Sequence, residues 1–425
     1  MDQEQEKAIK QELIYQLRSG FAPTRGFQYF ATGINDAAKC DLAGLDHAQK
    51  GNGAVRVVIA HFGTGKTLHI NLSRSFATGK KFVTSVIRFD EQIKLSYGIA
   101  KNEEQSPLWQ AIVNDLRPTL PVILENFYEN LKPEDGDILK AAEEKLEALT
   151  MTGSKDFKLV IKKYVQAKIQ GGAAGEETMR HCIDWLKGAY RRRDVARKDL
   201  GNDLENIIKC GNWYQIIQCF SKFVTLAGYN GLAVYMDEAS ALYDIELSSS
   251  RQANYAVILS LLNDNIPYLY VMLAGRAELI TNRRRGMFSN EALEMRLKPN
   301  PHEEELAVRD YNQPLIVLKP LTPAEDFILL RRIKQLYEEA FDVQLPVTEE
   351  NLKALLEEFL NQPGGERMLV PRELIRGFLF ILVSMHNNPD TPFSHYCKEA
   401  VAEGKKKLTE VNPVAGNEIK PIEEL

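Results

Sequence analysis

The stretch Val57-Val58-Ile59-Ala60-His61-Phe62-Gly63-Thr64-Gly65-Lys66-Thr67 decides the fold of this chain. Residues Ala54 to Ile59, apart from Arg56, are apolar without alternation, as expected of a strand covered on both faces. After Thr67, apolar residues recur every four positions until Gly79 ends the run. The sequence therefore predicts a buried strand, a glycine-containing loop and a helix in direct succession.

The loop in this stretch has the chemistry of a phosphate-binding site. Two glycines let backbone N–H groups converge on phosphate oxygens at a helix N-terminus, where the helix dipole favours negative charge. Lys66 is expected to bind the β- and γ-phosphates of a nucleotide, and the Thr67 hydroxyl is expected to bind Mg²⁺. Alanine replaces the usual first glycine of this pattern and is small enough to fit. The residues predicted to bind the nucleotide are Ala60, His61, Phe62, Gly63, Thr64, Gly65, Lys66, Thr67 and Leu68.

Two adjacent carboxylates give the second strong signal. Asp237 and Glu238 end the apolar run that starts at Gly231. Parallel α/β sheets bind ligands at the carboxyl ends of their strands. We therefore expect Asp237 to hold the hydration shell of Mg²⁺ and Glu238 to orient or polarise the attacking water. The alternative is a surface Asp-Glu pair at a helix start, which the helix dipole also favours.

Composition sets the broad class of the protein. The chain has 425 residues, a 44% apolar content and a formal net charge of −5, so any nucleic-acid contact requires a local basic patch. Five cysteines without CxxC spacing, and a start without an apolar signal region, lead us to expect a cytoplasmic protein. No apolar run approaches the roughly 20 residues of a membrane helix, so no membrane association is expected.

Hydrophobic periodicity along the chain predicts an α/β fold with a five-stranded parallel sheet. Further strands are expected at 82–89, 231–238, 268–274 and 314–318. The expected organisation is an N-terminal lead-in (1–35), a nucleotide-binding core (36–320) interrupted by a helical insertion at about 95–228, a helical lid (321–404) and a disordered or docking tail (405–425). A lead-in of this kind could fold over the nucleotide base.

Several arginines are candidates for a role at the γ-phosphate. Arg296 lies after the helix at 291–294, where ring-forming ATPases present an arginine to a neighbouring subunit, and the triplet 283–285 competes for that role. Arg372 opens a lid helix and could contact the phosphate from the other side, or pair with a nearby glutamate instead. Arg276 follows the fourth strand, where a polar Asn or Thr is more usual.

A second basic triplet, Arg191-Arg192-Arg193, lies near Trp185 and Tyr190. Contacts with nucleic-acid phosphates are one interpretation, and a solvated helical face is the favoured one. His61 and His69 flank the phosphate loop without companion ligands, so we interpret them as loop and helix-surface residues instead of metal ligands.

With these residues assembled, the chain resembles the AAA+ ATPases of the ASCE P-loop class and, among them, the ATP-binding protein family of bacterial BREX phage-defence systems. The resemblance to the BREX family rests on the order in which the matching segments occur along the chain. They are residues 19–26, 62–67, 185–188, 236–239, Arg251 with Asn254-Tyr255, 273–275, 285–286 with 291–293, 318–322 and 371–373. Two positions depart from the family pattern. Glycine is usual at the position of Ala60, and the motif that contains Arg276 is typically Ala-Gly-Thr.

The resemblance implies an ATPase that works with a DNA methyltransferase, a helicase or other large defence components, as a homo-oligomer on DNA. Two other interpretations stay open. One is a low-turnover, ATP-dependent switch or scaffold of the signalling type. The other is a DNA-loading ATPase similar to origin-recognition proteins, for which a C-terminal winged helix is expected and the sequence after residue 405 is too short.

Overall fold

The computed structural model describes the whole chain except residues 1–2, 62, 132–135, 299–309, 362–369 and 406–425. The chain divides into two compact units. The first comprises Met1–Lys39, Val58–Ser75 and Ile316–Leu425, and the second comprises Cys40–Val57 and Phe76–Leu315. The tail expected at 405–425 lies, beyond Lys405, outside the described residues.

A five-stranded parallel sheet carries the nucleotide-binding fold, as the sequence predicts, and its strand order is β2-β3-β4-β1-β5. Its central strands are almost completely buried, which explains their apolar runs. Strands β2, β3 and β4 pair in parallel, with Arg88 opposite Asp237 and Met236 opposite Leu273. The strands are β1 (Gly53–Ala60), β2 (Val83–Arg88), β3 (Leu232–Asp237), β4 (Leu269–Arg276) and β5 (Leu315–Val317).

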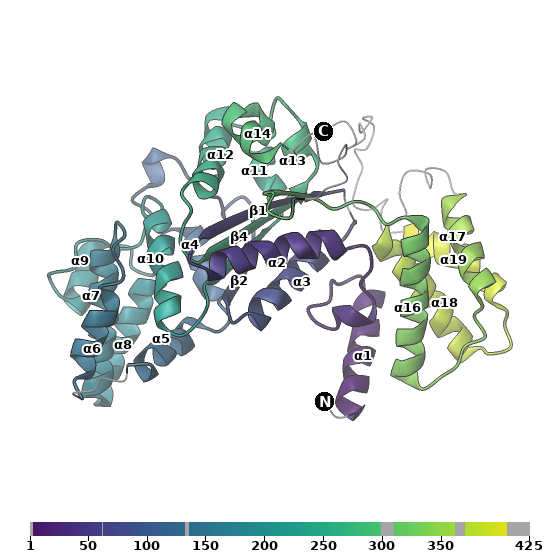
Figure 1. Ribbon diagram of the computed structural model, residues 1–425, viewed down its shortest axis with the longest axis horizontal. Coiled ribbons are helices and arrows are strands. Elements are labelled where there is room, and N and C mark those ends of the chain that lie inside the picture. Colours follow the sequence, from purple (N-terminus) through teal and green to yellow (C-terminus); the bar gives the residue numbers. More distant parts are fainter. Residues whose placement is uncertain (1–2, 62, 132–135, 299–309, 362–369, 406–425) are drawn as a thin grey trace. The chain divides into compact units, whose positions relative to one another are not determined.

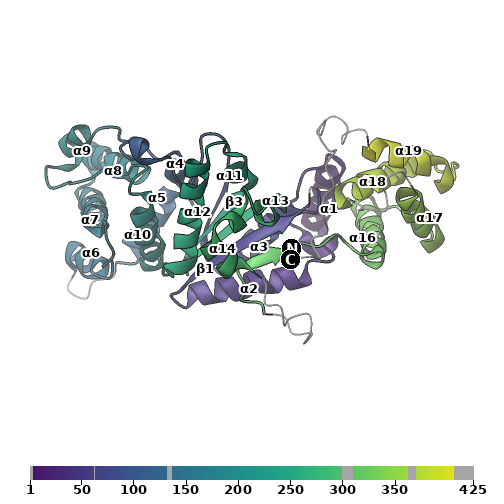
Figure 2. The ribbon, with the colours of Figure 1, turned by 90° about the horizontal axis from the view of Figure 1, so that it is seen from above.

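The segment between β2 and β3 is helical. Helices α5 to α10 gather in one group in both views (Figure 1, Figure 2). Aromatic rings fill its core, where Phe223 packs against Phe127 and Phe157 with ring centroids 5.1 and 5.5 Å apart. The helices are α4 (Pro107–Asn114), α5 (Leu120–Glu129), α6 (Ile138–Leu146), α7 (Ser154–Gln170), α8 (Gly172–Leu186), α9 (Arg193–Leu200) and α10 (Trp213–Leu226).

Helices α11 to α14 follow the carboxyl ends of β3 and β4 within the second unit. They lie together above the sheet in Figure 1. Helix α14 begins with an Asn290 cap, whose side chain accepts a hydrogen bond from the Leu293 N–H. These elements are α11 (Ser240–Asp244), α12 (Ser248–Asn263), α13 (Glu278–Thr281) and α14 (Glu291–Leu297), and α2 (Asn35–Gln49) precedes β1.

The first unit contains the phosphate-loop helix, the N-terminal helix and the lid. A capping box between Thr322 and Glu325, with Pro323 at the first helical position, starts the first lid helix. The N-terminal helix packs against lid helices α16 and α18. Ion pairs of Lys7 with Asp342 and of Lys10 with Glu339 support this packing. The elements are α1 (Gln3–Arg18), α3 (Lys66–Gly79), α16 (Pro323–Phe341), α17 (Glu349–Leu360), α18 (Pro371–Asn387) and α19 (Phe393–Lys405).

None of the helices in the described part of the chain combines the length and apolar character that crossing a bilayer requires.

Candidate functional site

The phosphate loop runs from the end of β1 at Ala60 to the start of α3 at Lys66. Gly63 and Gly65 have φ angles of 83° and 99°, in the left-handed region that other residues seldom adopt. This backbone turns the chain so that the loop leads directly into a helix N-terminus. Ala60 is the last residue of the extended strand, where a Cβ causes no strain, which explains why alanine is tolerated there.

Hydrogen bonds within the loop hold its shape. The Thr64 hydroxyl donates to the His61 carbonyl at 2.7 Å. Lys66 Nζ donates to the carbonyls of Ala60 and His61 at 3.4 and 3.3 Å, so this ammonium group folds back over the loop. Thr67 is exposed and Leu68 is half-buried, whereas Phe62 lies outside the described residues. The loop thus offers backbone donors, an ammonium group and the hydroxyl of an exposed threonine, the groups that a Mg²⁺-bound triphosphate requires.

Within the same unit, two residues at the start of α18 lie beside glycine-containing segments. A Cβ built on Gly63 would lie 2.3 Å from Cγ1 of Val370, so the lid residue Val370 covers the loop closely. Arg372, the second residue of α18, is exposed, and its Cδ lies 3.8 Å from a Cβ built on Gly20. The side-chain amide of Asn71 on α3 donates to the carbonyls of Ala22 and Pro23. The N-terminal segment is therefore attached to the phosphate-loop helix and to the lid.

In the second unit, the two predicted carboxylates end β3. Asp237 is the last residue of the strand, and its Oδ1 accepts a hydrogen bond from the backbone N–H of Glu238 at 2.8 Å. Glu238 has a φ angle of 56°, an uncommon left-handed conformation for a residue that is not glycine. Arg88, at the end of β2, lies 3.5 Å from its carboxylate. Strained backbone of this kind concentrates at active sites, which supports a functional role for Glu238.

The candidate arginines have different surroundings in the second unit. Arg276 ends β4, and its guanidinium donates to both carboxylate oxygens of Asp244 at 3.2 and 2.9 Å. Arg285 donates to the carbonyls of Tyr243 and Ile245, so its side chain is bound within the unit. Arg296 lies in the last turn of α14 instead of after the helix, and it is exposed.

Helix α14 ends later than predicted because Leu293 and Leu297 are both buried, which extends its apolar face by one turn. His69 also differs from its prediction as a helix-surface residue, since it is 1% exposed. It lies on the face of α3 that also buries Ile70. No group of three or more potential metal-binding side chains occurs among the residues that the structure describes.

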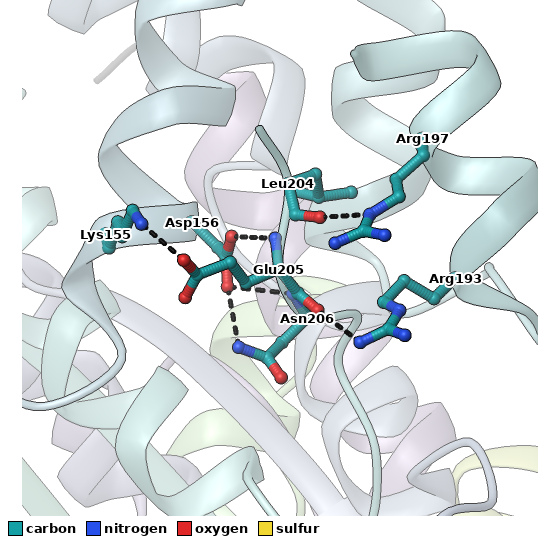
Figure 3. Close-up of polar contacts among 7 residues, drawn as sticks. All are labelled: Lys155, Asp156, Arg193, Arg197, Leu204, Glu205 and Asn206. Carbon is teal, nitrogen blue, oxygen red and sulfur yellow. Dashed lines mark hydrogen bonds and ion pairs between the residues drawn. The ribbon is translucent and has the colours of Figure 1, made fainter. Parts of the chain in front are cut away.

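The basic triplet 191–193 is exposed, and each of its side chains contacts another group of the insertion. Arg191 donates to the Gln105 side chain, Arg192 pairs with Asp194, and Arg193 donates to the Glu205 carbonyl. Figure 3 shows Arg193 and Arg197 pointing at the 204–206 segment. The nearby Trp185 is 1% exposed and therefore belongs to the core. This arrangement favours the solvated helical face over a stacking surface for nucleic acid.

Three residues that contact the site were not predicted as such from the sequence. The register of β2 and β3 places Arg88 next to Glu238. The lid residue Val370 lies against the phosphate loop. Asp244 forms an ion pair with Arg276. Each contact joins residues more than 30 positions apart, and local patterns do not report contacts at that range. Of the three, only Arg88 could have been noticed in the sequence, because it lies one residue before Phe89, where the second strand is predicted to end.

A model of the family described as BREX system ATP-binding protein BrxC/D matches residues 6–400. The chain belongs to this family. The family description supports an ATP-binding protein of a BREX-like system, in agreement with the resemblance seen in the sequence.

Among solved structures, the chain is similar to the Walker-type ATPase PABY2304 of Pyrococcus abyssi. The two share 12% sequence identity, the match covers 89% of this chain and 74% of that chain, and the TM-score is 0.39. No curated protein matches the chain.

Proposed function

We propose that this member of the BrxC/D family is a Mg²⁺-dependent ATPase of a BREX-like defence complex. The observation that carries the proposal is the phosphate loop, in which left-handed Gly63 and Gly65 lead into α3 at Lys66. This backbone suits a triphosphate, because loop N–H groups and the helix N-terminus both attract negative charge. The proposed site residues are those of the loop, 60–68, together with Asp237 and Glu238.

Each side chain in this proposal has a separate role. Lys66 binds phosphate oxygens, and Thr67 and Asp237 provide hard oxygen donors for Mg²⁺, which would neutralise phosphate charge when bound. Glu238 orients the water that attacks the γ-phosphorus, while the bond to the leaving ADP oxygen breaks. Arg372 would contact the γ-phosphate from the lid, and Arg296 would do so from a neighbouring subunit.

Equilibrium binding of ATP tests the assignment of the loop. Lys66→Ala is expected to weaken ATP binding at least about tenfold, because a charge-assisted contact with phosphate is lost. Lys80→Ala is the matched control, since Lys80 follows the same helix and is ion-paired with Asp46. Thr67→Ala and Asp237→Asn are expected to lower the effect of Mg²⁺ on binding. Equal affinity of the Lys66 and Lys80 variants would contradict the loop assignment.

Assembly is the second part of the proposal. Arg296 is exposed in α14, so its guanidinium is accessible to another copy of the chain. Mass measurement of the purified protein with and without ATP tests this. An oligomer that forms with nucleotide and loses activity on Arg296→Ala supports action in trans, whereas a persistent monomer contradicts it.

Defence components such as a methyltransferase or a helicase, and DNA, are the proposed partners, in a reducing cytoplasm. The five free cysteines suit that compartment. Replacing Arg191, Arg192 and Arg193 by alanine tests direct DNA contact. If they bind phosphates, DNA binding weakens and its salt dependence becomes shallower. An unchanged salt slope contradicts that role.

A low-turnover switch is the second candidate function. The ion pair between Arg88 and Glu238 favours it, because this pair occupies the carboxylate that would otherwise orient water. Release of the pair by a partner would then control turnover. The rate of phosphate release after removal of Arg88 distinguishes this switch from a constitutive ATPase.

A further inference from the structure

The helix that follows Glu238 is attached to the end of β4 at three points. The Ala239 N–H donates to the Ala274 carbonyl at 2.8 Å. The Arg276 N–H donates to the Ser240 hydroxyl oxygen at 2.6 Å, and the Arg276 guanidinium binds both carboxylate oxygens of Asp244. We call Ser240, Asp244 and Arg276 the α11 latch, because these residues hold both ends of α11 against β4.

The two halves of the latch differ in burial. Ser240 is 3% exposed, so its hydrogen bond is shielded from water. The side chains of Arg276 and Asp244 are 43% and 57% exposed, so their ion pair, in which Arg276 Nη2 contacts both carboxylate oxygens, is partly screened by solvent. The strand end also approaches α11 closely, since a Cβ on Gly275 would lie 3.3 Å from both the N and Oγ atoms of Ser240. The latch therefore combines a buried hydrogen bond at the start of α11 with an exposed ion pair at its end.

The latch lies next to a strained residue. Glu238 has a φ angle of 56°, and such a conformation persists only where the flanking structure determines it. On one side, the Phe89 N–H donates to the Asp237 carbonyl at 3.0 Å and fixes the strand end. On the other side, the backbone is fixed by Ala239 and by the latch. The direction in which Glu238 projects from the sheet thus depends on where α11 is held.

We propose that Arg276 is a positioning residue that, with Ser240 and Asp244, holds α11 so that Glu238 projects in its working direction. The inference deepens the proposed ATPase function and rests on it. An arginine replaces the more usual small polar residue at the end of β4 because this chain uses its long side chain to reach Asp244. The Arg276 guanidinium is bound to Asp244 on α11, so Arg276 affects the reaction by positioning Glu238.

Loosening the latch should lower kcat without changing the KM for ATP, because Glu238 acts on the water and not on nucleotide binding. Arg276→Ala and Asp244→Ala are each expected to lower kcat about three- to tenfold, the size expected for one lost charge-assisted hydrogen bond. The double variant should be no slower than either single variant, because both remove the same contact. Arg276→Lys keeps the charge and one donor, and it should restore part of the rate.

Arg180→Ala is the matched control. Arg180 forms an exposed ion pair with Glu177 in the insertion, with side chains 67% and 64% exposed, so the same truncation is made far from α11 in sequence. Its kcat should equal that of the wild type. Thermal unfolding of every variant checks that lost activity does not arise from lost folding.

Amide hydrogen exchange tests the latch without any turnover. In the wild type, the N–H groups of Ala239 and Arg276 should exchange slowly, and Ser240→Ala should accelerate exchange at Arg276 at least about tenfold, because its acceptor is removed. Unchanged exchange would overturn the latch as a physical contact.

The kinetic outcomes separate the inference from the proposed function. If the wild type hydrolyses ATP and Arg276→Ala behaves like Arg180→Ala, the positioning role is overturned and the ATPase function stands. A loss that appears in KM or in thermal stability, with kcat unchanged, also overturns it. If the wild type binds ATP but releases no phosphate in any condition, the proposed function itself fails, together with the inference built on it.

Discussion

The Nη2 atom of Arg88 lies 3.5 Å from the Oε1 atom of Glu238, across the carboxyl ends of β2 and β3. The parallel register produces this contact, because it pairs Arg88 with Asp237. The two side chains are 76% and 43% exposed, so water screens their attraction and the pair adds little to stability. We expect the pair to affect the rate of hydrolysis, since it engages the carboxylate that is proposed to orient water.

Arg88→Ala is expected to raise the basal rate of phosphate release about two- to fivefold, because an exposed ion pair of up to about 1 kcal/mol no longer holds Glu238. Steady-state phosphate release at saturating ATP measures this. Arg88→Lys keeps the charge and should stay close to the wild type. A rate in Arg88→Ala well below that of the wild type would show that the pair assists hydrolysis instead of restraining it.

The contact between Gly63 and Val370 predicts a specific compensation. Gly63→Ala places a methyl group 2.3 Å from Val370 Cγ1, and it also forces alanine to a φ of 83°. We expect ATP binding to weaken at least about tenfold, since strain of about 1–3 kcal/mol falls on the loop. Adding Val370→Ala removes the colliding atom and should restore part of the affinity.

Gly65→Ala is the control for this prediction. Its φ of 99° is equally unfavourable for alanine, but the nearest atom to its Cβ is Leu68 Cβ at 3.9 Å. Val370→Ala should therefore not rescue it. Equal rescue of both glycine variants, or of neither, would contradict a direct contact between the lid residue and the loop.

A buried carboxyl in the lid predicts how stability depends on pH. Asp326 is 1% exposed, its Oδ1 has no hydrogen-bond partner among the described residues, and burial raises its pKa from 3.8 to about 7. Between about pH 4 and pH 7 the unfolded chain loses this proton and the folded chain keeps it. The free energy of unfolding should therefore fall across that range, by at most about 4 kcal/mol, and level off above pH 7.

Asp326→Asn should abolish this dependence, because an amide does not ionise. Urea unfolding at pH 5 and pH 8 gives the comparison. The wild type should be less stable at pH 8 than at pH 5, whereas the variant should lose much less between the two. If both proteins lose the same free energy, another group carries the pH dependence.

Asp156, in the first turn of α7, should be essential for the stability of the insertion. Its carboxylate accepts hydrogen bonds from the Glu205 and Asn206 backbone N–H groups and from the Asn206 side chain at 2.7, 3.0 and 3.0 Å (Figure 3). Asp156→Ala leaves these donors without their acceptor and should lower the free energy of unfolding by about 2–4 kcal/mol. Asp194→Ala, at an exposed ion pair with Arg192, should change it by less than about 0.5 kcal/mol. Similar losses in both variants would contradict the anchoring role.

Much of the fold could be predicted because its determinants are local. The strand expected at 54–59 differs from β1 by one residue at each end, and the helix expected after Thr67 begins two residues earlier, at Lys66. The segment 171–175 contains three glycines, yet α7 ends at Gln170 and α8 begins at Gly172, so only Gly171 lies between the two helices. Packing decides this: a Cβ on Gly175 would lie 2.5 Å from the Ala167 carbonyl oxygen, so glycine permits close contact between α7 and α8.

The candidate site was predictable in its residue types and less so in its contacts. Lys66, Asp237 and Glu238 follow from short patterns that the chemistry of phosphate binding restricts. The partners of Glu238 and Arg276 do not, because they depend on strand register and on how helices pack over the sheet edge. The left-handed backbone of Glu238 has no signal in the sequence, since the strain arises from surrounding structure.

Phosphate release by the wild type and by Glu238→Gln tests the central claim most directly. The glutamine variant keeps the size of the side chain and removes its charge, so ATP binding should persist while hydrolysis falls at least about a hundredfold. The account predicts measurable release by the wild type that is lost in the variant. Equal release by both proteins, with DNA and partner proteins present, would contradict ATP hydrolysis by this chain through Glu238.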